Sequence, residues 1–311
     1  MIQEALLRIG TRGSALALAQ AAQVAAALAA AHPALAVPGA IATVPIRTTG
    51  DRVQDRPIYE IGGKALFTKE IEDALLAGRI DVAVHSGKDM PTFLPPGLTI
   101  GATLPREDPR DAFLSRIAPG IMDLPLGARV GTSSPRRAAQ LLHERRDLKI
   151  VPLRGNIDTR IGKLDVGVAD AAILAVAGLK RLGLADRITA LVPLDQMLPA
   201  PAQGAIALEI RAEDERAALY VGAIDDAPTS LCIAAERVFL AVLGGDCRTP
   251  IAALARIDSD GATLQFRATI LKPDGSVRLA AARDGAVGEA QAMAMDAGRE
   301  LIDRGGPGFF A

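Results

Sequence analysis

The chain has 311 residues; half of them are hydrophobic, only 3% are aromatic, and there is no tryptophan. It contains 35 lysines and arginines against 36 acidic residues, so its formal net charge of −1 gives no overall attraction to nucleic acid or membranes. The length indicates two or three domains of roughly 100 residues each. A core of Ala, Val, Leu and Ile suits buried strands flanked by helices. Any recognition of anions must therefore be local.

The two cysteines, Cys232 and Cys247, are not arranged in a CxxC motif. This spacing fits neither a disulfide framework nor a zinc site, and it indicates a reducing compartment. Cys232 lies in an apolar helical segment and is expected to be buried. The three histidines are scattered along the chain, so no metal site is expected.

An alanine-rich run at 15–31 follows Arg8 and Arg12, which superficially imitates an export signal. The run also contains glutamines, and Ser14 stands where a helix cap is expected, so we interpret it as an ordinary helix. No other stretch approaches the roughly 20 apolar residues of a membrane span. We therefore expect a soluble, cytoplasmic protein.

Short apolar runs alternate with helical segments up to about residue 200, which is typical of βα units and a mostly parallel sheet. Ile80, Val82 and Val84 are expected to share one face of a strand. Prolines crowd residues 91–109, so we place a crossover to a second domain near residue 105. The other elements expected before the crossover are strands at 6–10 and 42–47 and helices at 15–31 and 69–76.

The alternation resumes after the crossover and ends at Pro199 and Pro201. The following segment, 204–211, is interpreted as a strand that returns to the first sheet. From about residue 223 the pattern becomes a helix, a strand meander and a closing helix, which indicates a small α+β domain. The expected strands are 128–131, 148–153, 169–175, 251–257, 264–271 and 276–281, and the expected helices of the last part are 231–243 and 289–304.

These patterns predict three domains. Domain 1 is α/β and comprises residues 1–104 and 200–222. Domain 2, also α/β, comprises 105–199, and domain 3, the α+β domain, comprises 223–311.

The segment 130–137, VGTSSPRR, is the most informative motif. A strand ends there in small hydroxyl residues, with Ser134 as a helix cap and Pro135 at the first helical position. A helix N-terminus attracts anions, but Arg136 and Arg137 add positive charge where the helix dipole disfavours it. The pattern indicates a ligand that supplies negative charge. The alternative is a solvated helix whose arginines bind nothing.

Basic residues follow other expected strand ends in the same way, and Asn156 is expected to cap a helix after the strand at 148–153. In open α/β sheets, ligands bind beyond the carboxyl ends of the strands, so these side chains are expected to converge on one cleft. Guanidinium groups bind carboxylates or phosphates in bidentate fashion. Since the chain has no GxxxxGK[ST] or GxGxxG motif, several carboxylates are favoured over phosphate. The residues concerned are Arg12, Arg154, Arg160, Lys180 and Arg181.

The segment 81–91, DVAVHSGKDMP, carries a strand into a loop that presents Lys88 and Asp89 where catalytic groups lie in such folds. Asp89 is a candidate carboxylate for cationic chemistry, or else a turn cap. His85 is expected on the strand face opposite Val82 and Val84, and we interpret it as structural.

Two glycine-containing loops complete the candidates. The glycines at 62–63 form either a lid hinge or a loop without function. Cys247 lies in the glycine turn 243–250, LGGDCRTP, where Arg248 favours a reactive thiolate and Asp246 opposes it.

Together these motifs resemble the hydroxymethylbilane synthase (porphobilinogen deaminase) family along nearly the whole chain. The resemblance implies two periplasmic-binding-protein-like α/β domains around a cleft plus a small C-terminal α+β domain, in a monomeric enzyme. It also implies the head-to-tail condensation of four porphobilinogens, with loss of ammonia, on a dipyrromethane primer, followed by hydrolytic release of linear hydroxymethylbilane. The stretches that carry the resemblance are 8–14, 62–70, 84–91, 131–137, 153–156, 177–179, 203–204 and the cysteine turn.

The resemblance further implies a role for each matching residue. Cys247 would hold the dipyrromethane cofactor through a thioether, and Asp89 and Lys88 would be catalytic. The other residues implied to contact the cofactor are Lys64, Ser86, Thr132, Ser134, Arg136, Arg137, Arg154 and Gly155. Those implied to contact porphobilinogen are Arg12, Ser14, Gln20, Phe67, Arg154, Arg160, Arg181 and Gln203.

Each pyrrole of such a ligand carries two carboxylates, which would account for the many arginines. The family usually has a small residue where this chain has Asp246, and a carboxylate there is expected to disfavour the thiolate. Two rival interpretations leave Cys247 unmodified. One is a polycarboxylate-binding protein, which normally needs an export signal; the other is a nucleic-acid-binding module using 134–137, which the net charge and the few aromatic residues disfavour.

Overall fold

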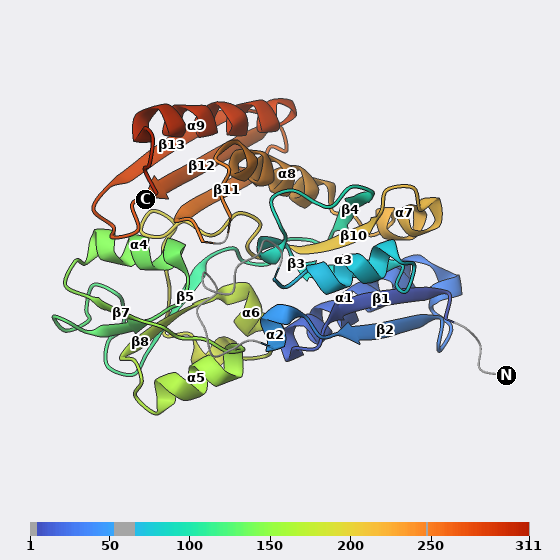
Figure 1. Cartoon of the computed structure of the whole chain (residues 1–311), viewed down its shortest axis with the longest axis horizontal. Helices are drawn as coiled ribbons and strands as arrows, with labels where there is room; N and C mark the ends of the chain where they lie inside the picture. Colours follow the sequence, from blue (N-terminus) through green and yellow to red (C-terminus); the bar gives the residue numbers. More distant parts are fainter. Residues whose placement is uncertain (1–4, 53–65, 247, 311) are drawn as a thin grey trace. The chain divides into compact units, whose positions relative to one another are not determined.

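The computed structural model describes residues 5–52, 66–246 and 248–310 (Figure 1). Within these ranges the strands form two five-stranded sheets and one three-stranded sheet. Two compact units contain them: the first comprises Met1–Glu107 and Ala205–Ser230, and the second comprises Asp108–Gly204 and Leu231–Ala311. The expected fold class, two α/β domains with a small C-terminal α+β domain, is confirmed at this level. The three domain limits given above stay a prediction.

The sheet of the first unit has the strand order β2-β1-β3-β10-β4 (Figure 1). Strands β1, β2 and β3 are parallel, whereas β10 runs antiparallel to both β3 and β4. The strands are β1 (Leu7–Arg12), β2 (Ile41–Ile46), β3 (Val82–Ser86), β4 (Leu98–Thr103) and β10 (Ile206–Arg211), and the α-helices are α1 (Ala15–Ala31), α2 (Thr49–Arg52), α3 (Lys69–Leu76) and α7 (Glu215–Gly222).

Apolar side chains cover both faces of this sheet, because the strands alternate their residues between the two sides. On one face, Val82 and Val84 pack with the buried residues of α1 and α7. On the other face, Ala83 packs with Ile71 and Leu75 of α3. Ile80 joins this second cluster, so the expectation that it shares a face with Val82 and Val84 is wrong: it precedes β3 and packs beneath α3.

The sheet of the second unit has the order β7-β6-β8-β5-β9. It repeats the plan of the first: β6, β7 and β8 are parallel, and β5 runs antiparallel to β8 and β9. Its strands are β5 (Asp111–Ser115), β6 (Arg129–Gly131), β7 (Lys149–Val151), β8 (Ala171–Ala175) and β9 (Ala190–Leu191), and its α-helices are α4 (Pro135–Glu144), α5 (Ile157–Asp165) and α6 (Val176–Arg181). Helix α4 packs on one face, and α5 and α6 pack on the other.

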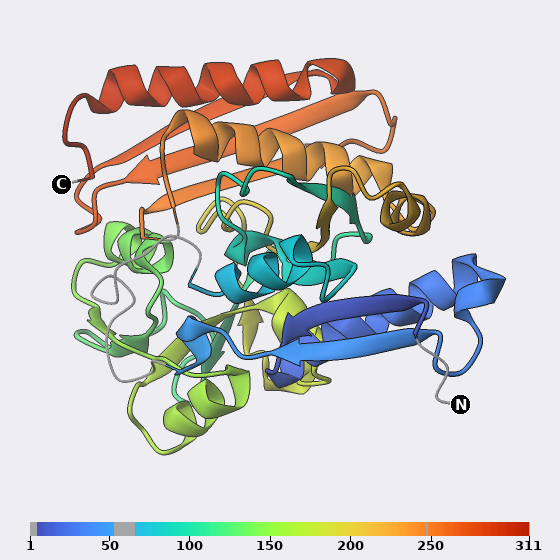
Figure 2. The same cartoon turned by 45° about the vertical axis from the view of Figure 1, so that its right-hand side comes forward.

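The C-terminal part is a meander of three antiparallel strands, β11 (Ile251–Ile257), β12 (Thr263–Leu271) and β13 (Arg278–Ala286). Helices α8 (Ala227–Val242) and α9 (Ala290–Gly305) share one core with the strands, in which Phe239 contacts Phe266 edge to face. Figure 2 shows α9 running along this sheet. Cys232 of α8 is buried, as expected.

The sequence patterns missed three strands, β4, β5 and the two-residue β9, and overstated the parallel character of the sheets. The first missed strand, β4, lies among the prolines, which an edge strand tolerates because it need not donate hydrogen bonds on both sides. The second, β5, begins two residues after Pro109. Since β5 and β10 run antiparallel to their neighbours, the two large sheets are mixed. The return of the segment at 206–211 to the first sheet is confirmed.

In the described part of the chain, no helix is both long enough and apolar enough to cross a membrane.

The turn between β12 and β13 lies against α4, and this contact requires glycine. Gly275 has φ +72°, and a Cβ there would come within 2.6 Å of the His143 backbone nitrogen. Gly261 has the similar φ of +69° in the β11–β12 turn, with nothing within 4 Å. Gly261→Ala should therefore cost only about 1 kcal/mol of unfolding free energy for its backbone strain. Gly275→Ala should cost about 1–3 kcal/mol more, because it also forces the turn away from α4.

Urea unfolding of both variants measures the difference. Equal losses for the two variants would show that the contact with α4 contributes nothing.

Candidate active site

A pocket opens in the first unit at the carboxyl ends of β1 and β3. It brings together six of the residues expected at the active site, namely Arg12, Ser14, Gln20, Phe67, Ser86 and Asp89.

Arg12, the last residue of β1, is held in this pocket by two neighbours. Its guanidinium binds the Asp51 carboxylate, with Nη2 2.5 Å from Oδ1, and lies 4.3 Å from the centroid of the Phe67 ring. The ring packs on Gly50, where a Cβ would come within 2.2 Å of it. Burial alone would raise the pKa of Asp51, but the hydrogen bonds from Arg12 and Thr48 outweigh it and hold this pKa below its ordinary value. Asp51 therefore stays ionised and keeps Arg12 in place.

Helix α1 is tied to the end of β3 across the pocket wall. Ser14 caps the helix, as expected, and its Oγ accepts a hydrogen bond of 3.3 Å from the Ala17 N–H. The side-chain amide of Gln20 is buried beside the Ser86 hydroxyl. The hydroxyl oxygen lies 3.0 Å from Gln20 Nε2 and 3.1 Å from Gln20 Oε1, within hydrogen-bond distance of both atoms. These contacts fix the hydroxyl of Ser86 beside the pocket.

Lys88 and Asp89 belong to a 3₁₀ turn, Gly87–Asp89, directly after β3. The Gly87 N–H donates to the Ala205 carbonyl at 2.9 Å, which ties the turn to the residue before β10. Asp89 is exposed and lines the pocket, whereas Lys88 is half-buried. The turn therefore presents a carboxylate to the pocket on a short backbone segment anchored to the sheet.

A second set of expected residues lies in the second unit, where β6 leads into α4. Ser134 caps α4 and accepts a hydrogen bond of 3.4 Å from the Arg137 N–H, and Pro135 takes the first helical position. The Thr132 hydroxyl accepts from the Ser134 N–H at 3.2 Å. The capping expected from the sequence is confirmed, and these hydroxyls shape the turn between strand and helix.

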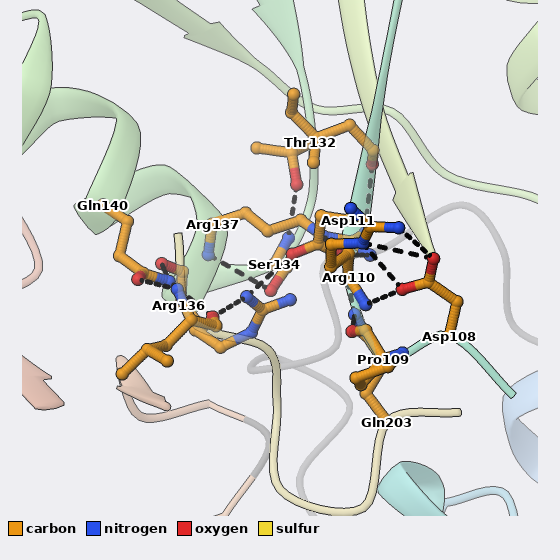
Figure 3. Close-up of polar contacts among 12 residues, drawn as sticks. Asp108, Pro109, Arg110, Asp111, Thr132, Ser134, Arg136, Arg137, Gln140 and Gln203 are labelled. Atoms are coloured by element: carbon orange, nitrogen blue, oxygen red, sulfur yellow. Dashed lines mark hydrogen bonds and ion pairs between the residues drawn. The ribbon is translucent and has the colours of Figure 1, made fainter. Parts of the chain in front are cut away.

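Arg136 and Arg137 are both buried and share one carboxylate, that of Asp111 (Figure 3). Arg136 Nη1 lies 2.9 Å from Asp111 Oδ2 and donates to the Leu198 carbonyl. Arg137 donates to Asp111 Oδ1 and to the Ile173 carbonyl. Burial would raise the pKa of Asp111, but the two guanidinium groups more than offset this and hold it well below its ordinary value.

Two cations against one anion leave a net positive charge in this buried cluster. Burial lowers the pKa of Arg136 despite the attraction of Asp111, so the single carboxylate does not fully stabilise its charge. The Nε of Arg136 is also buried without a hydrogen-bond partner among the described residues. A buried donor of this kind is costly unless a ligand or water accepts from it.

Gln203 belongs to the same cluster, with its side-chain amide donating to Asp111 Oδ1 at 2.9 Å and to the Pro109 carbonyl at 2.7 Å (Figure 3). Asp111 can meet all three side chains because β5 runs antiparallel to β8, which pairs Asp111 with Ala175 at the carboxyl end of β8.

The remaining expected residues of the second unit surround the segment after β7. Asn156 caps α5, as expected, and Gly155 has φ +114°. Arg160 Nε donates to the Gly155 carbonyl at 2.7 Å, whereas Arg154 Nη1 is buried without a hydrogen-bond partner among the described residues. Arg181, at the end of α6, donates to the Gly204 carbonyl at 2.7 Å.

Lys64, the glycine pair at 62–63 and Cys247 lie outside the described residues. Of the residues beside Cys247, Asp246 has a carboxylate that accepts from the Arg248 N–H at 2.8 Å and pairs with the Arg248 guanidinium at 2.5 Å. The Asp246 N–H donates to the Thr249 hydroxyl at 3.0 Å. The negative charge of Asp246 is therefore compensated within its own turn.

Sequence reasoning missed Asp111 and Asp51, which hold the key arginines. One signal was available for Asp111: a carboxylate that opens an apolar strand, DAFLS, is costly to bury without a cationic partner. For Asp51, no sequence signal pointed to Arg12, 39 residues away.

The fold and these sites define an α/β protein with cationic side chains at the carboxyl ends of its strands. Residues 7–218 match the family model described as porphobilinogen deaminase, dipyromethane cofactor binding domain, and residues 230–303 match porphobilinogen deaminase, C-terminal domain. The chain belongs to the porphobilinogen deaminase family.

Curated relatives match over nearly their whole length. The porphobilinogen deaminase of Nitrobacter hamburgensis is 53% identical over 98% of this chain and 95% of its own. That of Paracoccus denitrificans is 55% identical over 98% of this chain and 96% of its own. The chloroplastic porphobilinogen deaminase of Oryza sativa subsp. japonica is 50% identical over 98% of this chain and 86% of its own. Among solved structures, a nutrient-binding protein from Burkholderia cenocepacia bound to methionine matches 72% of this chain and 93% of its own, with 15% identity and a TM-score of 0.44.

The Asp111 cluster makes a prediction about stability. Asp111→Asn leaves two buried guanidinium groups without their anion and should cost about 3–5 kcal/mol of unfolding free energy at pH 7. Because the pKa of Asp111 is lowered in the folded protein, its contribution is present at neutral pH and is lost as the pH falls below about 4. Urea unfolding at pH 7 and at lower pH should show the two proteins converging in acid.

Asp165→Asn is a matched control, since Asp165 pairs with Arg187 at the surface at 2.6 Å. It should cost about 0.5 kcal/mol or less. The account of the cluster is wrong if Asp111→Asn costs no more than this control.

Proposed function

We propose that this chain is a hydroxymethylbilane synthase. It would condense four porphobilinogens head to tail with release of ammonia, on a dipyrromethane primer, and then release linear hydroxymethylbilane by hydrolysis. The observation that carries this proposal is the buried cluster in which Arg136 and Arg137 share only the Asp111 carboxylate. Its excess positive charge suits an acidic ligand, and the chain matches porphobilinogen deaminases over nearly its full length.

The described residues fit a cofactor that carries several carboxylates. Arg154 Nη1 and Arg136 Nε are buried donors without a hydrogen-bond partner in the described chain, and each could donate to a carboxylate oxygen. We propose that the dipyrromethane is attached to Cys247 and held by Lys64, Ser86, Thr132, Ser134, Arg136, Arg137, Arg154 and Gly155. When bound, it supplies the free pyrrole α-carbon from which the product is extended.

The substrate residues have distinct tasks in this proposal. Arg12 binds a carboxylate of porphobilinogen while Asp51 keeps its guanidinium oriented. Phe67 offers an apolar wall beside that guanidinium, and Gln20 holds the Ser86 hydroxyl. The other residues proposed to contact substrate are Ser14, Arg154, Arg160, Arg181 and Gln203.

Asp89 is the proposed catalytic carboxylate. Its position on the pocket wall allows a carboxylate oxygen to accept a pyrrole N–H, which stabilises positive charge on that ring as ammonia leaves. The same oxygen can then hold the proton that the ring gives up when the new carbon–carbon bond forms. Lys88, next to it in the turn, would supply a positive charge for substrate carboxylates.

Asp246 does not oppose cofactor loading in this proposal. Its carboxylate is paired with Arg248, so its effect on a thiolate at Cys247 is reduced compared with that of an unpaired acid.

We further propose that the protein acts in the cytoplasm as a monomer, without nucleic acid or membrane partners. The reducing environment indicated by its two cysteines and its net charge of −1 support this.

A first prediction concerns the covalent cofactor. The intact mass of the purified, active protein should exceed the sequence mass by two linked pyrroles, and Cys247→Ala should have the mass of the bare chain. Cys232→Ala is the control and should keep the added mass, since Cys232 is buried in α8. An active protein with the bare mass contradicts the proposal.

A second prediction concerns Asp89. Asp89→Asn should keep the added mass but lose at least about 100-fold in turnover of porphobilinogen, because the amide cannot take up the proton. Asp303→Asn changes an exposed carboxylate on α9 and should retain full activity. Turnover by Asp89→Asn close to that of the unchanged protein would remove Asp89 from the catalytic role.

A further inference from the structure

A cluster of buried acid and histidine side chains lies beneath the pocket of the first unit. Its members are Glu72 of α3, His85 of β3 and Glu209 of β10, which are 4%, 5% and 0% exposed. We call these three residues the acid–histidine cluster. The sequence patterns did not associate them, because they come from three different elements and Glu209 lies 124 residues from His85.

The strand register explains how the three residues meet. In the β3–β10 ladder, His85 is opposite Ala207 and Ala83 is opposite Glu209. Residues directly opposite in an antiparallel pair share a face, as do residues two apart in one strand. His85 and Glu209 therefore lie diagonally on the face that α3 covers, and Glu72 is a buried residue of α3.

Two carboxylate oxygens of the acid–histidine cluster lack a hydrogen-bond partner in the described chain. His85 Nε2 lies 3.0 Å from Glu209 Oε2, and the second oxygen of Glu209 and Oε1 of Glu72 are buried without a partner among the described residues. Burial and the nearby Glu209 charge raise the pKa of Glu72 by more than the Thr68 hydroxyl and His85 lower it. Two carboxyl groups and one imidazole thus share a buried space that holds too few hydrogen-bond donors for their oxygens. This shortage favours a cluster that keeps a bound proton.

Such a cluster is a costly way to build a core. Apolar side chains of similar volume usually stabilise a protein at least as well as a buried ion pair does. The cluster is not remote from the chemistry, because His85 itself lines the pocket, together with Ser86 and Asp89. Only Ser86 stands between His85 and the Gly87–Asp89 turn, and backbone pairing holds this segment against β10 and the residue before it.

We propose that the acid–histidine cluster holds a proton beneath the pocket and positions the Ser86–Asp89 turn, so that its charge sets the pH dependence of catalysis. His85, Glu72 and Glu209 are positioning residues, which act on the reaction through the turn. The charged groups that face His85 are Glu209 from β10 and Glu72 from α3, with Arg12 and Asp89 on the pocket side. The pH dependence would be measured on synthase activity, so this part of the test rests on the proposed function.

Glu209→Gln tests this role. The amide oxygen can still accept from His85 Nε2, but the buried negative charge of Glu209 is lost. The pH profile of kcat for the cofactor-loaded enzyme should shift by about one unit toward lower pH. The same shift should appear in the imidazole ¹⁵N signals of His85, which His85→Asn identifies among the three histidines.

Asp81→Asn is the matched control. Asp81 is also a buried carboxylate beside β3, but it lies before the strand and pairs with Arg8 at 2.8 Å. This variant should lose stability and keep the unchanged pH profile. If Glu209→Gln behaves like it, with lower stability but an unchanged pH profile and unchanged His85 signals, the cluster is only structural and the proposal is overturned.

Glu72→Gln keeps the test decisive if Glu209→Gln does not fold. It removes the second negative charge near His85, leaves the bond to Glu209 intact, and should shift the pH profile in the same direction. It should also be no less stable above neutral pH, because the raised pKa of Glu72 destabilises the folded protein once that acid ionises. Unchanged imidazole ¹⁵N signals of His85 in this variant overturn the proposal. If the signals shift but the unchanged protein has no synthase activity, only the proposed function is refuted.

Discussion

The ion pairs of Asp111 with Arg136 and Arg137 are the constraint on which the candidate site of the second unit depends. They hold the first turn of α4 against the end of the sheet and fix Gln203 beside it. A single buried carboxylate cannot neutralise two guanidinium groups, so the cluster retains positive charge at the place where ligands bind in α/β sheets. The acidic ligand of the porphobilinogen deaminase family would complete this charge balance.

The mixed sheets make such clusters possible. In a purely parallel sheet, only carboxyl ends of strands reach the ligand-binding edge. Here β5 runs the opposite way, so its first residue, Asp111, lies beside the last residue of β8. Strand β10 has the same relation to β3 in the first unit, where Ile206 pairs with Ser86. Each antiparallel strand therefore brings its own residues to the edge where the parallel strands deliver theirs.

Local patterns predicted much of this fold. The helices at 15–31 and 69–76 and the strand at 251–257 have the expected bounds, and Ser14, Ser134 and Asn156 cap the helices assigned to them. Caps and periodicity depend on residues close in sequence, which explains this success. The strand β13 ends at Ala286, five residues beyond its expected end, because pairing with β12 continues there.

The partners of the arginines could not be predicted in the same way. Arg12 pairs with Asp51 across 39 residues, and His85 meets Glu209 across 124. Such contacts depend on which elements become neighbours and in which direction they run, and the sequence patterns did not specify the direction of β10. The candidate ligand-binding residues were found because basic side chains follow strand ends. The acids that orient them became visible only in the folded chain.

A crystal structure of the purified, cofactor-loaded protein tests the central claim most directly. The account predicts ligand carboxylate oxygens within hydrogen-bond distance of Arg154 Nη1 and Arg136 Nε, the two buried nitrogens without partners. Finding both nitrogens bonded only to water or to protein groups, with the ligand carboxylates elsewhere, would contradict it.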